Sequence, residues 1–236
     1  DEPGAWLVGV SGGHSTAEVL DRVELTPLPP YILAARRRRT GDGATDPESL
    51  DRERYQTVYA GEAGSVAAPT AGLHFAPGLL AALREGGVGR ADVLLHVGSG
   101  TFKPVETEFV EEHPMHGEWC SMPEATVQAI LRTREAGGRV IAVGTTAART
   151  IEAYAAAMEG KPRPADLTTR LLITPGYRWR WVDGLLTNFH LPRSTLMALV
   201  GSLLDGDGIG RLKGLYGRAI AEGYRFYSYG DAMLVR

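Results

Sequence analysis

From residue 64 onward, short apolar segments alternate with amphipathic segments of helical length, and glycine-rich turns separate them. Apolar segments with strand character lie at 91–97, 140–143 and 185–189, and helices are predicted over 77–85, 124–136, 147–158, 193–204 and 209–222. Buried strands between amphipathic helices favour a mainly parallel sheet or an α/β barrel. The sequence therefore predicts an α/β fold for this part of the chain.

Local signals add detail to this prediction. Ser121 stands three residues before Glu124, the spacing of a capping box, so we expect Ser121 to open the helix that ends at Gly137. Further strands are expected over 171–173, 177–181, 224–229 and 232–235. In the second of these, aromatic and cationic residues alternate, as Tyr-Arg-Trp-Arg-Trp. We expect the aromatic face to pack in the core, and stacking on nucleic-acid bases is the alternative.

The first quarter of the chain follows a different pattern. Residues 6–10 and 19–25 have strand character, and the prolines from Pro27 to Pro30 then stiffen the chain, so we place a domain boundary at Pro27. Residues 34–53 are expected to form a charged surface loop. Its arginines, Arg36–Arg39, are either a solvated run or an arm that contacts phosphates. Because the chain begins at Asp1 without a methionine, we expect the start of a longer protein to be missing.

Composition excludes several classes of protein. Hydrophobic residues make up 44% of the 236 residues, which supports a folded core and excludes a disordered tail. A net charge of −3 argues against a generic polyanion binder. The single cysteine, Cys120, excludes an internal disulfide framework. No apolar run is long enough to span a bilayer and no signal peptide is visible, so we expect a cytoplasmic protein without membrane contact.

Polar residues and histidines gather in the turns that follow the expected strands. In parallel α/β folds the loops after strand carboxyl ends share one face, where ligands bind. We therefore expect one site that contains Thr70–His74, His96–Thr101, Thr145-Thr146, Pro175-Gly176 and Asn188–His190. No Gly-x-Ser-x-Gly motif and no Walker lysine appears, so a serine hydrolase or a P-loop enzyme has little support.

Each of these residues also has a structural interpretation. The segment Gly98–Thr101 is either a tight turn or a cradle for an anion. Thr146 and Ser194 are candidate helix N-caps, and His190 could serve only to satisfy backbone groups. Asp231 lies between apolar residues, so its carboxylate needs either a structural partner or a function.

A metal site is a weaker alternative. His113, His116 and Glu118 have ligand types suited to zinc. Pro114 opposes a helix between the two histidines, and the spacing of the zinc peptidases is absent. We expect no metal.

Taken together, eight motifs in order resemble one known family. They are Pro27-Leu-Pro-Pro-Tyr-Ile32, Glu53-Arg-Tyr-Gln-Thr-Val-Tyr59, Ala67-Ala-Pro-Thr-Ala-Gly-Leu-His-Phe75, His96-Val-Gly-Ser-Gly-Thr-Phe102, His113-Pro-Met-His-Gly-Glu118, Gly144-Thr-Thr-Ala-Ala-Arg149, Thr187-Asn-Phe-His-Leu-Pro-Arg-Ser-Thr-Leu196 and Tyr224-Arg-Phe-Tyr-Ser-Tyr-Gly-Asp-Ala-Met233. The chain resembles the S-adenosylmethionine:tRNA ribosyltransferase-isomerase family of queuosine biosynthesis over residues 27–236.

The resemblance implies an enzyme that uses S-adenosylmethionine as a co-substrate and tRNA carrying 7-aminomethyl-7-deazaguanine as the acceptor. The ribosyl group is transferred and isomerised onto the wobble base, which gives epoxyqueuosine-tRNA, adenine and methionine. It also implies a barrel-like α/β main domain, residues 27–236, with a small all-β insertion, a β-barrel, of which residues 1–26 are a remnant. We expect a monomer.

The matching motifs and the chemistry together give the candidate site residues. A base must remove a proton next to the sulfonium and an acid must face the leaving adenine. The candidates for this acid/base work are His74, His96, His116, His190 and Asp231. The candidates for holding the co-substrate are Gly98, Gly100, Thr101, Thr145, Thr146, Arg149, Asn188, Ser194 and Thr195.

Two departures from the family keep other functions open. The family's N-terminal segment and most of its inserted domain are absent, and tryptophan stands at positions 119, 179 and 181 without a match to the family's expected residues. A paralogue with another acceptor, a non-catalytic RNA- or nucleotide-binding module, and a metal-dependent hydrolase built on His113 and His116 are the alternatives.

Overall fold

The structure is a computed structural model. It describes residues 9, 12, 13, 15, 18, 19, 25–40, 48–62, 64, 65, 67–97, 107–158 and 162–236. The chain divides into two compact units, residues 1–53 and residues 54–236. The expected strands at 6–10 and 19–25 lie almost wholly outside the described residues, and the boundary at Pro27 stays a prediction.

In the smaller unit, helices replace the expected surface loop at 34–40 and 48–53, and residues 41–47 of that loop lie outside the described residues. Helix α2 spans Pro30–Thr40, and α3 spans Glu48–Arg54. Proline suits the first turn of α2, and the following alanines and arginines are good helix formers, so the prediction of an irregular segment was wrong. The Arg36 guanidinium forms a two-pronged ion pair with the buried Asp51 carboxylate, which joins the two helices.

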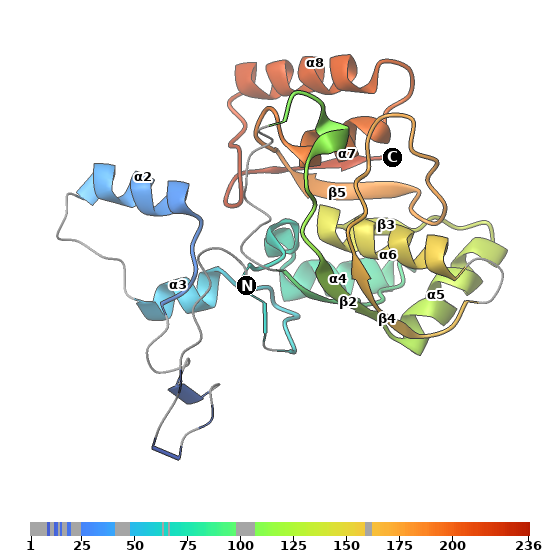
Figure 1. Ribbon diagram of the computed structural model, residues 1–236, viewed down its shortest axis with the longest axis horizontal. Coiled ribbons are helices and arrows are strands. Elements are labelled where there is room, and N and C mark those ends of the chain that lie inside the picture. The colour runs from blue at the N-terminus through green and yellow to red at the C-terminus, as the bar shows by residue number, and fades with distance from the viewer. Residues whose placement is uncertain are drawn as a thin grey trace. The chain divides into compact units, whose positions relative to one another are not determined.

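The larger unit contains two three-stranded sheets (Figure 1). The first has the order β1-β2-β4, with β1 at Leu94–His96, β2 at Glu118–Met122 and β4 at Ala165–Thr169, and both of its pairs are antiparallel. The second has the order β3-β5-β6, with β3 at Ile141–Val143, β5 at Gly184–Asn188 and β6 at Ala232–Val235. Here β3 and β5 are parallel, and β5 and β6 are antiparallel.

The expectation of a mainly parallel sheet was therefore wrong for the described strands. Only β3 and β5 run parallel among them, and the connection between these two strands passes through α6 and through β4 of the first sheet. What remains is a mixed α/β fold with two small sheets.

Helix α6, Thr145–Ala157, lies between the two sheets and contacts strands of both (Figure 1). Its sequence, rich in alanine, presents buried side chains on most of its surface, as expected of a helix covered on both sides. Ala148 and Tyr154 are fully buried there, and they belong to a core that also contains Leu185, Leu199 and Leu212.

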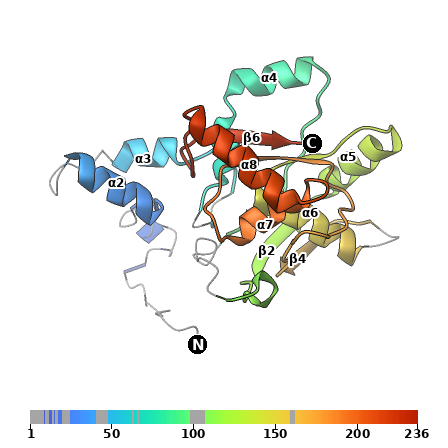
Figure 2. The same ribbon diagram turned by 90° about the horizontal axis from the view of Figure 1, so that it is seen from above.

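The remaining helices surround this core. They are the 3-10 turns η1, Thr70–His74, and η3, Val110–Glu112, and the helices α4, Pro77–Glu85, α5, Glu124–Glu135, α7, Thr195–Ser202, and α8, Gly208–Ala221. These α-helices confirm the predicted ones to within a few residues. Helices α7 and α8 pack against each other, whereas α4 has no buried residue and stands at an edge of the larger unit (Figure 2).

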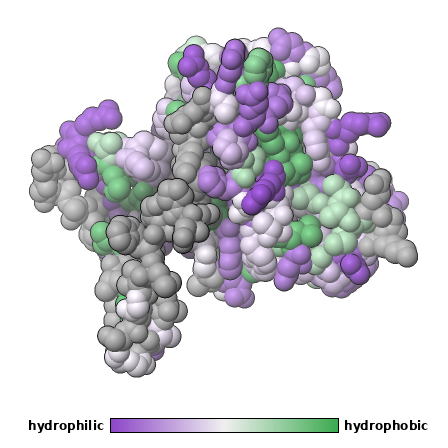
Figure 3. All heavy atoms as spheres, viewed as in Figure 1, coloured by the Kyte–Doolittle hydropathy of each residue, from purple (hydrophilic) through white to green (hydrophobic). Residues whose placement is uncertain are grey.

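On the face shown in Figure 3, hydrophilic side chains of the larger unit are interspersed with hydrophobic ones. None of the described helices has both the length and the apolar character that crossing a membrane requires.

Several local predictions were wrong because the backbone N–H and C=O groups of these segments form hydrogen bonds with partners other than the expected ones. Ser121 does not cap α5, because it lies within β2 opposite Leu94, and Pro123 precedes the helix instead. Residues 171–173, 177–181 and 224–229 form no strand, while the less apolar segment 165–169 does.

The aromatic segment 177–181 is held by a buried carboxylate. Glu152 of α6 is fully buried, and it accepts hydrogen bonds from the backbone N–H groups of Arg180, Trp181 and Val182 at 2.8–2.9 Å. It also accepts one from the Tyr177 hydroxyl at 3.1 Å. N–H groups donated to a carboxylate cannot pair with a neighbouring strand, so the segment is irregular.

The alternating exposure of this segment nevertheless follows the sequence. Tyr177, Trp179 and Trp181 pack against the core, while Arg178 and Arg180 are exposed, which confirms the core interpretation of the aromatic face. Burial and the adjacent Glu152 raise the pKa of Tyr177 to about 12, so its hydroxyl stays a hydrogen-bond donor at neutral pH.

The Glu152→Gln variant tests how much this contact stabilises the fold. An amide places an NH2 donor against donated N–H groups, so we expect the free energy of unfolding to fall by about 2–4 kcal/mol. Urea unfolding would measure it, with Glu135→Gln at an exposed position of α5 as the control, which should change stability by less than about 0.5 kcal/mol. Equal effects in the two variants would contradict the assignment.

Candidate active site

Two of the predicted site segments meet at the carboxyl ends of β3 and β5. Because these strands are parallel neighbours, Gly144-Thr145 and Asn188 reach the same edge of their sheet, as predicted. The Gly144 N–H donates to the Leu186 carbonyl at 2.9 Å. Gly144 has a φ of 91°, a left-handed conformation that favours glycine and turns the chain from strand into helix.

The 3-10 turn η1 brings a third segment to this edge. The Thr70 hydroxyl donates to Asn188 Oδ1 at 3.0 Å, and Asn188 Nδ2 lies 3.3 Å from His74 Nε2. A Cβ on Gly144 would lie 3.9 Å from that of Ala71, so η1 also approaches the start of α6. We call Thr70, His74, Thr145 and Asn188 the strand-end cluster.

The members of the strand-end cluster differ in exposure. Asn188 and Thr145 are buried, with 4% and 8% of their surface accessible, whereas His74 is exposed. Gly144 gives α6 no side-chain cap, so the first N–H groups of the helix remain available to a ligand. Thr146 is therefore not the N-cap, and it occupies the first turn. This arrangement offers an exposed imidazole beside a helix N-terminus that favours anionic groups.

Asp231 lies next to this cluster, because the residue after it, Ala232, pairs with Asn188. Its carboxylate accepts hydrogen bonds from Arg225, at 2.7 Å from the backbone N–H and 3.2 Å from the guanidinium. These contacts, with a smaller contribution from His74, hold the pKa of Asp231 below its usual range. The structural partner that the sequence required is thus Arg225.

His190 is in a different environment. Its Nε2 lies 2.8 Å from the Thr187 hydroxyl, and its backbone N–H donates to the Tyr216 hydroxyl at 2.9 Å. Desolvation of the ring lowers its pKa to about 4. A ring held neutral in this way is poorly matched to proton exchange near pH 7.

Ser194 caps helix α7, as one of the two interpretations predicted. Its hydroxyl accepts from the Met197 N–H at 3.2 Å and donates to the Leu191 carbonyl at 2.8 Å. Thr195 is the first residue of that helix. The capping contacts therefore use both the donor and an acceptor site of Ser194.

The other two candidate histidines belong to the first sheet. His96 ends β1 opposite Trp119, and the two rings lie 4.7 Å apart. His116 is exposed in the segment that leads into β2. In the described residues no hydrogen bond connects either one to the strand-end cluster.

Arg149 joins helix α6 to strand β2 of the first sheet through a buried ion pair. From the second turn of α6, its Nη1 lies 2.5 Å from Glu118 Oε2 at the start of β2, and its Nε donates to the Leu171 carbonyl. Both side chains are about 7% exposed. Among the described residues Nη2 of Arg149 has no hydrogen-bond partner.

Some of these partners could not be predicted from the sequence. The motif 113–118 offers Glu118 as a metal ligand or as the functional residue of a polar loop, and Thr70 has no separate role in the motif that contains it and His74. Glu118 is buried against Arg149 while His116 is exposed, so this ligand set is not assembled. No group of three or more metal-ligating side chains comes together in the part of the chain that is described. Gly98, Gly100 and Thr101 lie outside the described residues.

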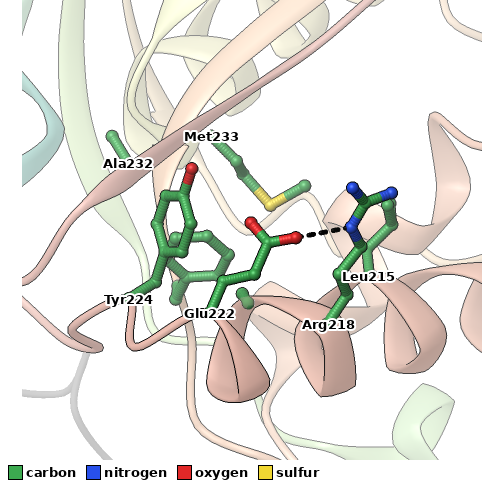
Figure 4. Close-up of a pocket in the computed structure, with 8 residues that line it drawn as sticks. Leu215, Arg218, Glu222, Tyr224, Ala232 and Met233 are labelled. Carbon is green, nitrogen blue, oxygen red and sulfur yellow. Dashed lines mark hydrogen bonds and ion pairs between the residues drawn. The ribbon is translucent and has the colours of Figure 1, made fainter.

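A shallow hollow of about 260 Å³ lies between α8 and β6 (Figure 4). Its lining is Phe189, Leu215, Arg218, Ala219, Glu222, Tyr224, Ala232 and Met233. The Arg218 guanidinium forms a 2.7 Å ion pair with Glu222 across the rim, where both groups are solvent-exposed. Of the predicted site segments, 188–190 contributes Phe189 to this hollow, and its ionisable groups are the exposed ion pair and the Tyr224 hydroxyl.

Comparison with known proteins decides the family. A family model described as "Queuosine biosynthesis protein" matches residues 2–235. The chain belongs to this family.

Relatives within the queuosine biosynthesis family carry a more specific name. The S-adenosylmethionine:tRNA ribosyltransferase-isomerase of Gloeobacter violaceus is 52% identical over 232 residues, which cover 98% of this chain and 61% of the relative. The protein of the same name from Rhizorhabdus wittichii is 48% identical over 99% of this chain and 64% of its own length. The chain thus spans about three fifths of these two curated relatives.

A crystal structure of the S-adenosylmethionine tRNA ribosyltransferase from Thermotoga maritima shares the fold. Its TM-score to this structure is 0.58 at 40% identity, over 71% of this chain and 51% of that one. The likeness supports the mixed α/β architecture of the queuosine biosynthesis family.

The environment of His190 predicts a pH-dependent stability. Between about pH 6.5 and pH 4 the unfolded chain binds a proton here that the folded chain excludes, so stability falls as the pH falls. At pH 4 the loss amounts to about 3 kcal/mol, which His190→Gln should abolish. Urea unfolding from pH 7 to pH 4 measures it. Tyr216→Phe, which removes only the hydroxyl, should lower stability and keep the pH dependence, and an unchanged slope in His190→Gln would contradict the assignment.

The Arg149–Glu118 pair predicts a strong coupling between two substitutions. Glu118→Gln leaves a buried guanidinium without its carboxylate, so we expect a loss of about 3–5 kcal/mol of stability. The double variant Glu118→Gln/Arg149→Met should lose less than the sum of the single variants, because no buried charge is left unpaired. Glu222→Gln, in the exposed pair, is the control and should cost under about 1 kcal/mol. Additive losses would refute the coupling.

Proposed function

We propose that this chain carries the S-adenosylmethionine-binding part of a tRNA ribosyltransferase-isomerase. The enzyme would transfer and isomerise the ribosyl group of S-adenosylmethionine onto 7-aminomethyl-7-deazaguanine at the tRNA wobble position. The products would be epoxyqueuosine-tRNA, adenine and methionine. The observation that carries the proposal is the strand-end cluster, in which three of the family-like motifs contribute Thr70, His74, Thr145 and Asn188 to one edge.

The chemistry of the co-substrate fits this edge. The free N–H groups at the start of α6 are suited to an anionic group such as the methionine carboxylate. His74, which is exposed beside them, is placed to exchange or share a proton with a bound ligand. Arg149 lies one turn further along α6, where its charge is paired with Glu118 and Nη2 has no partner among the described residues.

The other candidate residues stay part of the proposal, and they differ in how near they lie to the strand-end cluster. Thr146 and Asp231 border the strand-end cluster, and Ser194 and Thr195 begin the helix that follows β5. Gly98, Gly100 and Thr101 would form the loop after β1, with His96 and His116 at the same end of the first sheet. His190 would have a supporting role as a neutral ring that is hydrogen-bonded to Thr187 of β5.

The proposal extends to the whole protein. Residues 27–236 would form a barrel-like main domain and residues 1–26 would belong to a small inserted β-barrel. The protein would act as a cytoplasmic monomer, with tRNA as its partner and no metal.

An assay for adenine release tests the function. The complete protein, S-adenosylmethionine and tRNA carrying 7-aminomethyl-7-deazaguanine would be incubated, with adenine followed by chromatography and the nucleoside by mass spectrometry. We expect adenine in step with a heavier wobble nucleoside, and a fall of at least about 10²-fold in His74→Gln if the ring does acid/base work. Adenine release without a modified nucleoside would indicate another acceptor. Binding of tRNA without adenine release would contradict the proposal.

A further inference from the structure

We infer that Asn188 is a positioning residue that holds the neutral His74 imidazole in the tautomer with its proton on Nδ1. The inference rests on the contacts within the strand-end cluster, and only its catalytic consequence rests on the proposed function. Neither the family description nor the names of the relatives assigns a role to Asn188.

The orientation of the Asn188 amide decides whether it donates a hydrogen bond to His74 or accepts one. Asn188 is the last residue of β5, pairs with Ala232 of β6, and has 4% of its surface exposed. The Thr70 hydroxyl donates to its Oδ1 at 3.0 Å. In the structure the carbonyl oxygen thus faces Thr70, and the NH2 group is the end that faces His74.

The tautomer of His74 follows from the chemistry of an amide. An NH2 group can only donate a hydrogen bond, so the ring nitrogen 3.3 Å away, Nε2, must be the acceptor. A neutral imidazole carries one proton, and its second nitrogen therefore bears it. In this arrangement His74 presents Nδ1–H as a donor, while the Nε2 lone pair is engaged by the protein.

The consequence for the reaction is a division of roles among the acid/base candidates. A neutral His74 ring with its Nε2 lone pair engaged is suited to donate a hydrogen bond from Nδ1 to the leaving adenine, and it keeps its one ring proton. The base that removes the proton next to the sulfonium would then be another group. Asn188 would act through His74 and not through the substrate.

Nitrogen NMR of the histidine rings tests the tautomer directly. The protein labelled with 15N-histidine would be recorded at a pH where the rings are neutral, with His74→Gln to assign the His74 signals. We expect a protonated Nδ1 and an unprotonated Nε2 in the wild type. A protonated Nε2 in the wild type would overturn the inference without any further variant.

The isosteric variant Asn188→Asp provides the second arm. A carboxylate can only accept, so the His74 tautomer should reverse to Nε2–H, although the side chain keeps its shape and its bond from Thr70. The matched control is Thr187→Val, which removes the hydroxyl beside His190 and should shift the His190 signals alone. An unchanged His74 tautomer in Asn188→Asp would refute the role of Asn188.

The kinetic arm separates positioning from direct contact with the substrate. Adenine release should slow by at least about 10²-fold in His74→Gln and in Asn188→Asp. The double variant should lie within about twofold of His74→Gln alone, because Asn188 acts through the ring. Multiplicative losses would overturn the positioning role. A wild-type protein that releases no adenine would refute the proposed function, and the NMR arms would still decide the tautomer.

Discussion

The fully buried carboxylate of Glu152 receives three backbone N–H groups and the Tyr177 hydroxyl, and the placement of α6 depends on these contacts. Burying a carboxylate is costly unless each of its acceptor sites is used. Here a whole irregular segment, residues 177–182, supplies the donors, and its aromatic side chains then cover the core. The segment leads directly into β5, so the same contact also sets where that strand begins.

Helix α6 connects the buried contacts of Glu152 to the candidate site. The helix carries Glu152 and the buried core residues, and its Arg149 joins the helix to Glu118 of the first sheet. The helix begins at the same end of the second sheet as Asn188, because β3 and β5 are parallel neighbours. A helix fixed at three places in this way holds its N-terminus in a constant position, which a site that orients a co-substrate requires. The exposed His74 is the one member of the strand-end cluster that faces solvent freely.

Sequence periodicity predicted most of the helices because their apolar faces and glycine stops are local signals. Helices α4, α5, α7 and α8 follow such patterns closely. The strand predictions were wrong where a side chain distant in the sequence accepts the backbone hydrogen bonds, as Glu152 does at 180–182. Nothing in the sequence of that segment indicates the presence of this carboxylate. The direction of the strands could not be predicted from the sequence either. Two helices separate β5 from β6, and the two strands nevertheless pair in antiparallel fashion.

The site could be predicted in its location but less well in its contacts. The rule that loops after parallel strands share one edge brought Thr145 and Asn188 together correctly. It could not reveal that Thr70 bonds to the Asn188 amide or that Arg225 pairs with the Asp231 carboxylate, because such pairings depend on distances of a few ångströms. The desolvation that lowers the pKa of His190 is likewise a product of packing around the ring.

Amide hydrogen exchange with and without S-adenosylmethionine tests the central claim, that the ligand binds at the strand-end cluster. The account predicts slower exchange in peptides that cover residues 70–74, 144–149 and 188–190 of the complete protein when the ligand is added. Protection confined to other segments, for example those around the hollow between α8 and β6, would contradict it.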